Sequence, residues 1–443
     1  MKRAKYISNG TITYKIVGEQ GPQGPQGEVG PQGPVGPQGP KGETYDDTEI
    51  KDKIANLSEK TKFFVTPEMF GAKGDGATDD TEAFKLLIQH ANTTGEVIRI
   101  PKGRYVVSDV LGELKDGHIQ GDYECLDYQK GSFIIDRRTP QLGGDVDTVL
   151  LKLTGKYTLE KIGFYGCDEI KNCIEFAGGW DSHVSQVAIY GYQNIAMKIT
   201  GMDITFNECF IMTSGSKTAD SASSARINYA IEMSNKANCV HFHNLHIEHC
   251  RFMLRMRDSY TNSFTNCKFE QSTWGVDANS EYPPINLYMI SNIMFNGCIL
   301  AGIASGAYLD LGLTAPSFML VHSSDSTRCT SFIANGTTFL AGLGSGGSAY
   351  TGTQSAKLIR NDGNTEIALN GCIFKYISED KGIDINNAVL TNNMIEIEND
   401  DRNTKPIVAL NSIITGNRIT KKKTTDQIIS TGSVLDNNMI LEP

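Results

Sequence analysis

A glycine stands at every third position from Gly18 to Gly42, nine times without an interruption. Six prolines each directly follow one of these glycines: Pro22, Pro25, Pro31, Pro34, Pro37 and Pro40. Only glycine fits at the crowded axis of three wound chains, so this strict period predicts a triple helix over residues 18–44. Eight triplets at about 3 Å per residue would form a rod of roughly 70 Å. The alternative is an unstructured Gly/Pro linker, but linkers do not keep a period of three for so long.

The segments on either side of this collagen-like rod are short. Residues 1–17 alternate weakly between apolar and polar side chains, and we expect a small β-structured attachment tip there. Residues 45–62 carry Ile50, Ile54 and Leu57 at helical spacing among charges, which predicts a short coiled-coil neck that clamps three chains. A surface helix packed on the following domain would show the same spacing. The sequence therefore predicts a homotrimer of four parts: 1–17, 18–44, 45–62 and one large domain over 63–443.

Composition limits the partners that this chain can have. Its 443 residues carry a formal net charge of −10 and no stripe of Lys and Arg, so we expect no nucleic-acid partner. No run of 18 apolar residues exists and no apolar segment follows the basic start, so we expect no membrane insertion, no secretory signal and synthesis in a cytoplasm. The ten cysteines lack metal-site spacing. We expect them to be reduced core residues, and we expect neither a metal nor a cofactor.

The large domain opens with two motifs. A glycine-rich turn runs through Gly74-Asp75-Gly76, and Asp79 with Glu82 forms a capping box that predicts a helix from about Thr81 to Ala91. The second motif is Ile100-Pro101-Lys102-Gly103-Arg104-Tyr105. Together, residues 63–107 resemble the opening of the pectate-lyase-like superfamily of right-handed parallel β-helices. The resemblance implies that the helix caps the N-terminal end of a β-helix. It implies no single activity, because the superfamily includes lyases, glycosidases, epimerases, phage tailspikes and non-catalytic binders.

After this opening, a short pattern recurs mostly every 21–25 residues. Each copy starts with an apolar residue and has a second apolar residue five positions later, and positions within a copy are counted from its first residue. In the last eight copies the third position is Asn or Gly seven times and Glu208 once, and Asn and Gly tolerate the left-handed backbone of a sharp bend. The copies start at Leu159, Val184, Phe206, Phe242, Phe264, Phe295, Leu369, Leu390, Ile414 and Leu435.

In seven of these copies the fourth position is a cysteine or an asparagine: Cys209, Cys267, Cys298 and Cys372, and then Asn393, Asn417 and Asn438. Stacked rungs would align these side chains into an inward ladder. A period of this length is a solenoid signature. We predict an all-β, right-handed parallel β-helix of roughly 12 rungs, about 60 Å long at ~4.8 Å per rung.

Three long segments break the period and are predicted to be loops, where solenoids place binding surfaces. They are Ser214–Ile227, Ala301–Ser317 and Leu340–Ser355, the last of which contains Tyr350. Trimer contacts or disorder are equally consistent with their composition.

One constellation of polar residues stands out, although no complete catalytic signature of a β-helix enzyme is present. The stretch Asn244–Glu248 aligns with Asn266–Glu270 one rung later, and strand alternation points His246, Glu248, Lys268 and Glu270 outward. Two carboxyls about 5 Å apart match the pair of a retaining glycosidase, so Glu248 and Glu270 are candidate catalytic residues. Ordinary surface charge pairing would give the same pattern. Candidate substrate-binding residues are His246, Lys268, Arg251, Trp274 and Tyr350, and a second candidate patch is Trp180 with Asp181 and His183.

The order of tip, rod, neck and β-helix resembles that of tailed-phage tail fibres and tailspikes. The resemblance implies a homotrimer on the virion, on the tail or another external appendage. It would be joined to a virion structural protein through residues 1–17 and would recognise a host cell-surface polysaccharide. A receptor-binding appendage without catalysis and a tailspike depolymerase, either a glycoside hydrolase or a lyase, both remain open. The missing catalytic signatures favour binding, and the rod disfavours a free pectin-type enzyme.

Overall fold

A computed structural model describes most of the large domain and two short strands at the start of the chain. The described residues are 2–8, 11–17, 64–122, 130–139, 148–169, 171–212, 229–234, 237–250, 252–274, 285–304, 319–323, 331–341, 359–363, 365–376, 381–397, 405–421 and 428–441. The predicted rod and neck lie outside these residues and stay predictions.

The chain divides into two compact units, Met1–Leu57 and Ser58–Pro443. In the first unit, β1 (Lys2–Ser8) and β2 (Thr11–Val17) form an antiparallel hairpin in which Lys2 pairs with Val17. The β structure expected for residues 1–17 is therefore present, whereas their attachment role stays a prediction.

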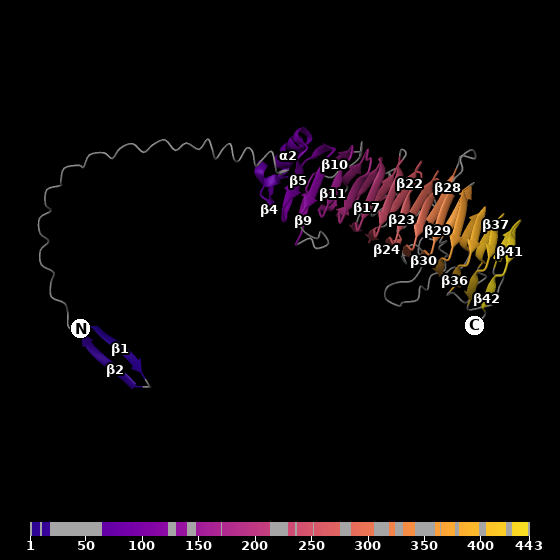
Figure 1. Ribbon diagram of the computed structural model, residues 1–443. Helices are drawn as coiled ribbons and strands as arrows, with labels where there is room; N and C mark the ends of the chain where they lie inside the picture. Colours follow the sequence, from indigo (N-terminus) through magenta and orange to yellow (C-terminus); the bar gives the residue numbers. More distant parts are fainter. Residues whose placement is uncertain are drawn as a thin grey trace. The chain divides into compact units, whose positions relative to one another are not determined.

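The second unit consists of three long parallel sheets around one apolar interior (Figure 1). The first sheet contains β3 (Phe64–Val65), β5 (Val97–Ile100), β8 (His118–Gly121), β11 (Thr158–Glu160), β14 (Ser182–Ser185), β17 (Met202–Asn207), β20 (Asn238–His243), β23 (Ser263–Thr265), β26 (Ile293–Asn296), β29 (Ser331–Asn335), β32 (Glu366–Asn370), β35 (Ala388–Thr391), β38 (Ile413–Thr415) and β41 (Val434–Asp436). The second sheet contains β4 (Asp75–Asp79), β6 (Gly103–Val107), β9 (Ser132–Asp136), β12 (Gly163–Glu169), β15 (Ala188–Tyr192), β18 (Phe210–Met212), β21 (His246–Glu248), β24 (Lys268–Trp274), β27 (Ile299–Ala304), β30 (Thr338–Ala341), β33 (Ile373–Tyr376), β36 (Met394–Ile397), β39 (Arg418–Lys421) and β42 (Met439–Leu441). The third sheet contains β7 (Gly112–Lys115), β10 (Val149–Thr154), β13 (Asn172–Phe176), β16 (Met197–Ile199), β19 (Ile231–Met233), β22 (Leu254–Arg257), β25 (Ile285–Tyr288), β28 (Met319–Ser323), β31 (Ile359–Gly363), β34 (Lys381–Asn386), β37 (Lys405–Leu410) and β40 (Ile428–Thr431).

Each turn of the chain places one strand in each sheet, except that the first turn (β3, β4) and the last turn (β41, β42) have none in the third sheet. Within each sheet a strand pairs in parallel with the strands one turn earlier and one turn later. This is a parallel β-helix, and the predicted fold class, all-β and right-handed, is confirmed. Against the roughly 12 rungs expected, the described residues form sheets of 14, 14 and 12 strands.

The bends between the first and second sheets have the backbone that the repeat predicted. All eight predicted positions have a positive φ: Glu208, Asn244, Asn266, Gly297, Gly371, Asn392, Gly416 and Asn437. Even Glu208 adopts φ 54° there. One rung was missed: it starts at Ala334 and bends at Gly336, because alanine is too small to mark a repeat by its hydrophobicity.

The position after each bend forms the predicted inward ladder. The cysteine ladder residues are buried, and the Cys267 thiol donates to the Phe242 carbonyl oxygen of the preceding rung at 3.5 Å. Further along, the Asn393 amide Nδ2 donates to Asn417 Oδ1 at 2.9 Å. Next to this ladder, the rings of Phe206, Phe242, Phe264 and Phe295 stack with centroids 4.6–4.8 Å apart.

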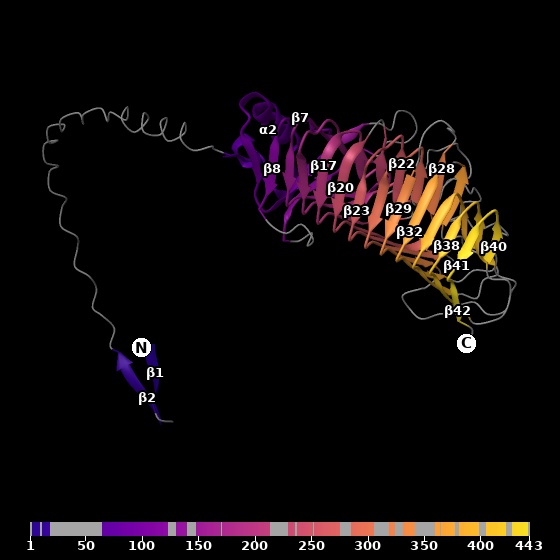
Figure 2. The ribbon, with the colours of Figure 1, turned by 45° about the vertical axis from the view of Figure 1, so that its right-hand side comes forward.

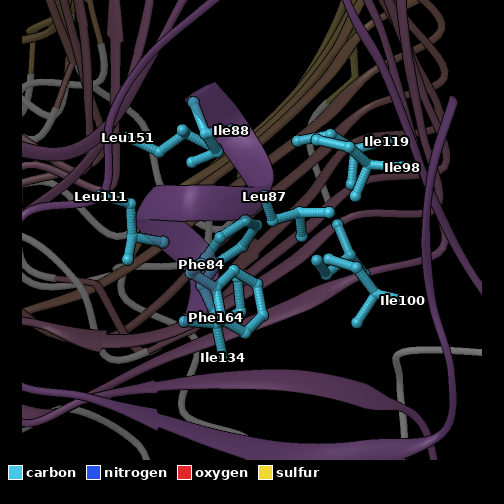
Figure 3. Close-up of a pocket in the computed structure, with 11 residues that line it drawn as sticks. Phe84, Leu87, Ile88, Ile98, Ile100, Leu111, Ile119, Ile134, Leu151 and Phe164 are labelled. Carbon is cyan, nitrogen blue, oxygen red and sulfur yellow. The ribbon is translucent and has the colours of Figure 1, made fainter. Parts of the chain in front are cut away.

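A short 3-10 helix, η1 (Pro67–Phe70), and one α-helix, α2 (Thr81–Thr94), lie at the N-terminal end of the β-helix. Figure 3 shows the apolar pocket under α2, which points Phe84, Leu87 and Ile88 towards side chains of the first rungs. The resemblance-based expectation of a capping helix therefore agrees with this structure.

The predicted capping box is wrong in its details. The N-cap is Asp80, whose carboxylate accepts hydrogen bonds from the backbone N–H groups of Lys73 at 2.7 Å and Gly74 at 3.1 Å. Asp79 instead accepts from the Thr81 backbone N–H at 3.0 Å. The two aspartates thus tie the glycine-rich turn to the helix, which ends at Thr94 rather than Ala91.

The predicted loops are mostly outside the described residues. Ser214–Ile227 and Tyr350 lie entirely outside them. Two predicted loops start later than expected, because residues up to Ala304 extend β27 and residues up to Ala341 extend β30. No helix in the described ranges is long and apolar enough to span a membrane.

Candidate functional site

The predicted polar constellation lies on the outer face of the second sheet. Strands β21 and β24 are neighbours, and their register pairs His246 with Lys268 and Glu248 with Glu270. Ile247 and Phe269, between them, are fully buried in the interior. Strand alternation therefore turns the four polar side chains outward, as the sequence predicted.

These side chains form one continuous network with His249. The His246 Nε2 atom lies 3.6 Å from Glu248 Oε2 and 3.8 Å from Glu270 Oε2. The two carboxylate oxygens are therefore at most about 7.4 Å apart, the sum of these distances. His249 Nε2 lies 2.9 Å from Glu248 Oε1, and Lys268 forms a close ion pair with Glu270. The carboxyls of the candidate catalytic pair thus flank one imidazole.

The electrostatics of this network hold His246 neutral and Glu270 ionised. Burial lowers the pKa of His246, and the nearby Lys268 ammonium lowers it further, against the opposing effect of the two carboxylates. The hydrogen bond from Lys268 lowers the pKa of Glu270. The buried His246 Nε2 atom is enclosed between these two carboxylates, so the groups of the network that a ligand can reach are the partly exposed Glu248, Glu270 and Lys268 side chains.

A row of aromatic rings leads along the same outer face to this network, and sequence reasoning missed it. The Tyr190 and Phe210 ring centroids are 5.6 Å apart, and the Phe210 and His246 centroids are 5.1 Å apart. Behind them, Phe133 is buried and its centroid is 6.2 Å from that of Tyr190. Gly163 makes room for it, because a Cβ there would lie 2.1 Å from the Phe133 ring. The sequence signal was weak, because Tyr190 pairs with Met212 and Phe210 pairs with Ala188, so the two rings do not occupy matching positions of their rungs.

The remaining predicted site residues are not brought into this site. Arg251 and Tyr350 lie outside the described residues, and Trp274 is placed only by its backbone pairing with Ala304. In the second patch, Trp180 is 70% exposed and lies just before β14 of the first sheet. The neighbouring Asp181 forms an ion pair with Lys156, with Oδ2 and Nζ 2.6 Å apart. This patch and the Glu248–Glu270 pair therefore belong to different faces of the β-helix.

Over the part of the chain that the structure describes, no group of three His, Cys, Asp or Glu side chains has the arrangement to hold a metal ion. The chemistry available on this face is therefore that of aromatic rings, carboxylates, an imidazole and an ammonium group.

Comparison with known proteins identifies the family of more than half of the chain. The family described as rhamnogalacturonase A/epimerase, pectate lyase-like, matches residues 65–304. Among curated proteins, the non-secreted LysM effector LysM19 of Penicillium expansum is 35% identical over 57 residues, which are 13% of this chain and 4% of that protein.

Solved structures share the fold at low sequence identity. The enzymatically active domain of bacteriophage CBA120 tailspike protein 2 is 13% identical with a TM-score of 0.50, over 83% of this chain and 51% of that one. The catalytic unit of a GH87 alpha-1,3-glucanase from Streptomyces thermodiastaticus is 13% identical with a TM-score of 0.43, over 85% of this chain and 65% of that one. This chain thus spans less than two thirds of either structure.

Proposed function

The chain belongs to the rhamnogalacturonase A/epimerase, pectate lyase-like family, and from this premise we propose that it is a tailspike-like virion appendage whose β-helix binds a host cell-surface polysaccharide. The proposed binding surface is the outer face of the second sheet, from Tyr190 through Phe210 to the network of His246, Glu248, Lys268 and Glu270. We call this set the second-sheet site.

The observation that carries this proposal is the continuity of aromatic and charged side chains along the column. Partly buried rings with centroids 5.6 Å and 5.1 Å apart add apolar surface on successive rungs, and the network adds hydrogen-bonding groups at one end. A sugar ring has an apolar face and a rim of hydroxyl groups, so it needs both kinds of partner. A chain of sugars can lie along successive rungs, and three copies of the site would strengthen weak single contacts.

A depolymerase is the second candidate function, and the pair of carboxylates favours it. An upper limit of about 7.4 Å between their facing oxygens admits both the ~5–5.5 Å spacing of retaining glycosidases and the shortest inverting spacings. In a retaining reaction the ionised Glu270 would be the nucleophile and Glu248 the proton donor. The lowered pKa of Glu270 suits a nucleophile and does not suit an acid.

The attachment and location of the protein are part of the same proposal. The β1–β2 hairpin would bind a virion structural protein, and three chains would be joined by the collagen-like rod and the neck. The protein would then stand on the outside of the virion, on the tail or another appendage.

The test measures binding and cleavage of capsular and cell-wall polysaccharides from candidate hosts by the full chain. We expect co-elution on size-exclusion chromatography, and we expect Tyr190→Ala and Glu270→Gln to weaken binding about tenfold or more, as truncation of a buried contact residue does. The matched control is Tyr288→Ala, which removes a partly buried tyrosine from the third sheet. Equal losses in Tyr190→Ala and the control would contradict the proposed surface, and a loss only in Trp180→Ala would move the site to the second patch.

A reducing-end assay on the same mixtures separates the two functions. Intact polysaccharide bound to the protein supports a receptor-binding appendage. Shortened chains support a depolymerase, and Glu248→Gln and Glu270→Gln should then abolish shortening while the protein stays folded. Shortening that survives both substitutions would rule out the carboxylate pair as its cause.

A further inference from the structure

The outer face of the first sheet changes character halfway along the column. From β26 to β41, one residue of each strand continues a single straight row, because the register pairs each member with the next. All six members are apolar: Met294, Ile333, Ala368, Val389, Ile413 and Val434. Four of them are 36–60% exposed. We call this set the apolar row, and it spans five rung steps, or about 24 Å. Figure 2 shows the first-sheet strands from β29 to β41 side by side on one face.

The neighbouring outward row on the same strands is polar but uncharged. It consists of Asn296, Asn335, Asn370, Thr391 and Thr415, again paired strand to strand. Several of these side chains bond to each other, such as Asn335 Nδ2 to Asn296 Oδ1 at 3.0 Å and Thr391 Oγ1 to Asn370 Oδ1 at 3.0 Å. Groups already hydrogen-bonded in this way lose little when water is removed. The one charged outward residue on these strands before β41 is Glu366, which begins β32.

The first half of the same face is different. There the outward positions carry ionisable groups, among them His118 with Glu160 at 3.9 Å, and His183 with Asp181 at 3.1 Å. In a chain with 21% charged residues, the switch to an apolar surface on which Glu366 is the one outward charge before β41 therefore marks a distinct region rather than a general property of the face.

We infer that this region, the apolar row with its uncharged neighbours, is the surface through which three copies of the β-helix pack against one another. An exposed apolar patch depleted of charge is typical of the centre of a protein interface. The occupant is a second copy of this chain, because the uninterrupted Gly-X-Y repeat predicts that three identical chains are held together.

The straightness of the row fits this arrangement. A row that runs parallel to the column can face a parallel three-fold axis, where the same residue of all three chains meets at one level. No second, complementary surface is then needed. A polysaccharide is a poor fit for this region, because the apolar row offers neither an aromatic ring nor a charged group. The inference rests on the predicted trimer and not on the second-sheet site, which lies on a different sheet and would remain accessible.

Disulfide trapping in the full chain tests this arrangement. Val389→Cys places a thiol in the apolar row, and Ile299→Cys places one on the outer face of the second sheet at the same 40% exposure. Near a three-fold axis the Cβ atoms of equivalent residues can come within the 3.5–4.5 Å that a disulfide requires. After mild oxidation we expect Val389→Cys to give covalent dimers on a non-reducing gel, up to about two thirds of the chains, since two of three thiols can pair. Ile299→Cys and the unsubstituted chain, which reports any background from the ten native cysteines, should stay monomeric on the gel.

Light scattering on the same samples makes every outcome decisive. A trimeric mass with trapping specific to Val389→Cys supports the inference. A trimeric mass with no trapping, or with equal trapping in Ile299→Cys, overturns the assignment of this face. A monomeric full chain overturns the trimer itself. None of these outcomes depends on polysaccharide binding, so they are independent of the proposed function.

Discussion

Cys372 and Asn393 occupy the same interior position on neighbouring rungs, but their side chains form different hydrogen bonds to the backbone beside the bend. The Asn393 side chain accepts the backbone N–H of Cys372 at 2.8 Å, and Asn417 accepts that of Asn393 at 2.9 Å. The Cys372 thiol instead donates to the Ala334 carbonyl oxygen at 3.3 Å. Each asparagine therefore satisfies a buried N–H of the preceding rung, which would otherwise cost about 1–3 kcal/mol. The ladder is structural, and it accounts for the four cysteines that belong to it.

His246 should make the stability of the β-helix depend on pH. Burial lowers its pKa below the ordinary value of 6.5 in the folded protein. As the pH falls through 6.5, the unfolded histidine therefore takes up a proton while the folded one stays neutral, so the free energy of unfolding decreases until the lowered pKa is passed. We expect His246→Gln to make the free energy of unfolding, measured by urea denaturation, depend less on pH between about pH 7.5 and about pH 5.5. An equal flattening by His183→Gln, a more exposed histidine of the first sheet, would contradict this assignment.

At the scale of elements, α2 closes the N-terminal end of the column with one face only. Phe84, Leu87 and Ile88 are buried against the first rungs, whereas Leu86 is 49% exposed. An open end would leave the apolar interior and the edges of three sheets accessible to other chains. The geometry of the glycine-rich turn serves this cap: Gly74 has φ +60°, and a Cβ there would lie 2.8 Å from the Tyr105 ring.

Two neighbouring leucines of α2 give a matched test of the cap. Leu87→Ala should lower the free energy of unfolding by about 2–5 kcal/mol, because it leaves a cavity in the pocket of Figure 3. Leu86→Ala should change it by no more than about 0.5 kcal/mol. Chemical denaturation of both variants provides the measurement, and similar losses in both would mean that α2 does not seal the end of the column.

For the molecule as a whole, the chain divides into its two compact units between Leu57 and Ser58. The predicted boundary after Lys62 lies close to this division. The second unit contains its own apolar interior from the first rung onwards, and none of the residues of that interior comes from the first unit.

A protein that starts at residue 63 should therefore fold by itself. We expect its far-ultraviolet circular dichroism to show β structure and its thermal transition to stay cooperative. Light scattering then reports what holds the chains together. A monomer would assign the clamp to the neck and rod, a trimer would assign it to the apolar row, and an unfolded product would contradict the division into two units.

The β-helix, its bends and its inward ladder could all be predicted from the amino-acid sequence. These features are local: a left-handed bend selects Asn or Gly, an inward position selects a small or hydrogen-bonding side chain, and each recurs once per rung. The alignment of Glu248 with Glu270 followed from the same repeat. Where a copy is weak, as at Ala334, the repeat was not recognised.

Apart from the pair Glu248 and Glu270, the residues of different rungs that share an outer surface are evident only in the folded chain. Tyr190 and Phe210 are 20 positions apart, and Met294 and Ile333 are 39 apart across a long insertion, yet each pair lies on adjacent strands. Outward side chains have no packing requirement that would repeat in the sequence, and insertions of variable length separate them. Their adjacency is set by strand register alone, and that register exists only once the rungs have stacked.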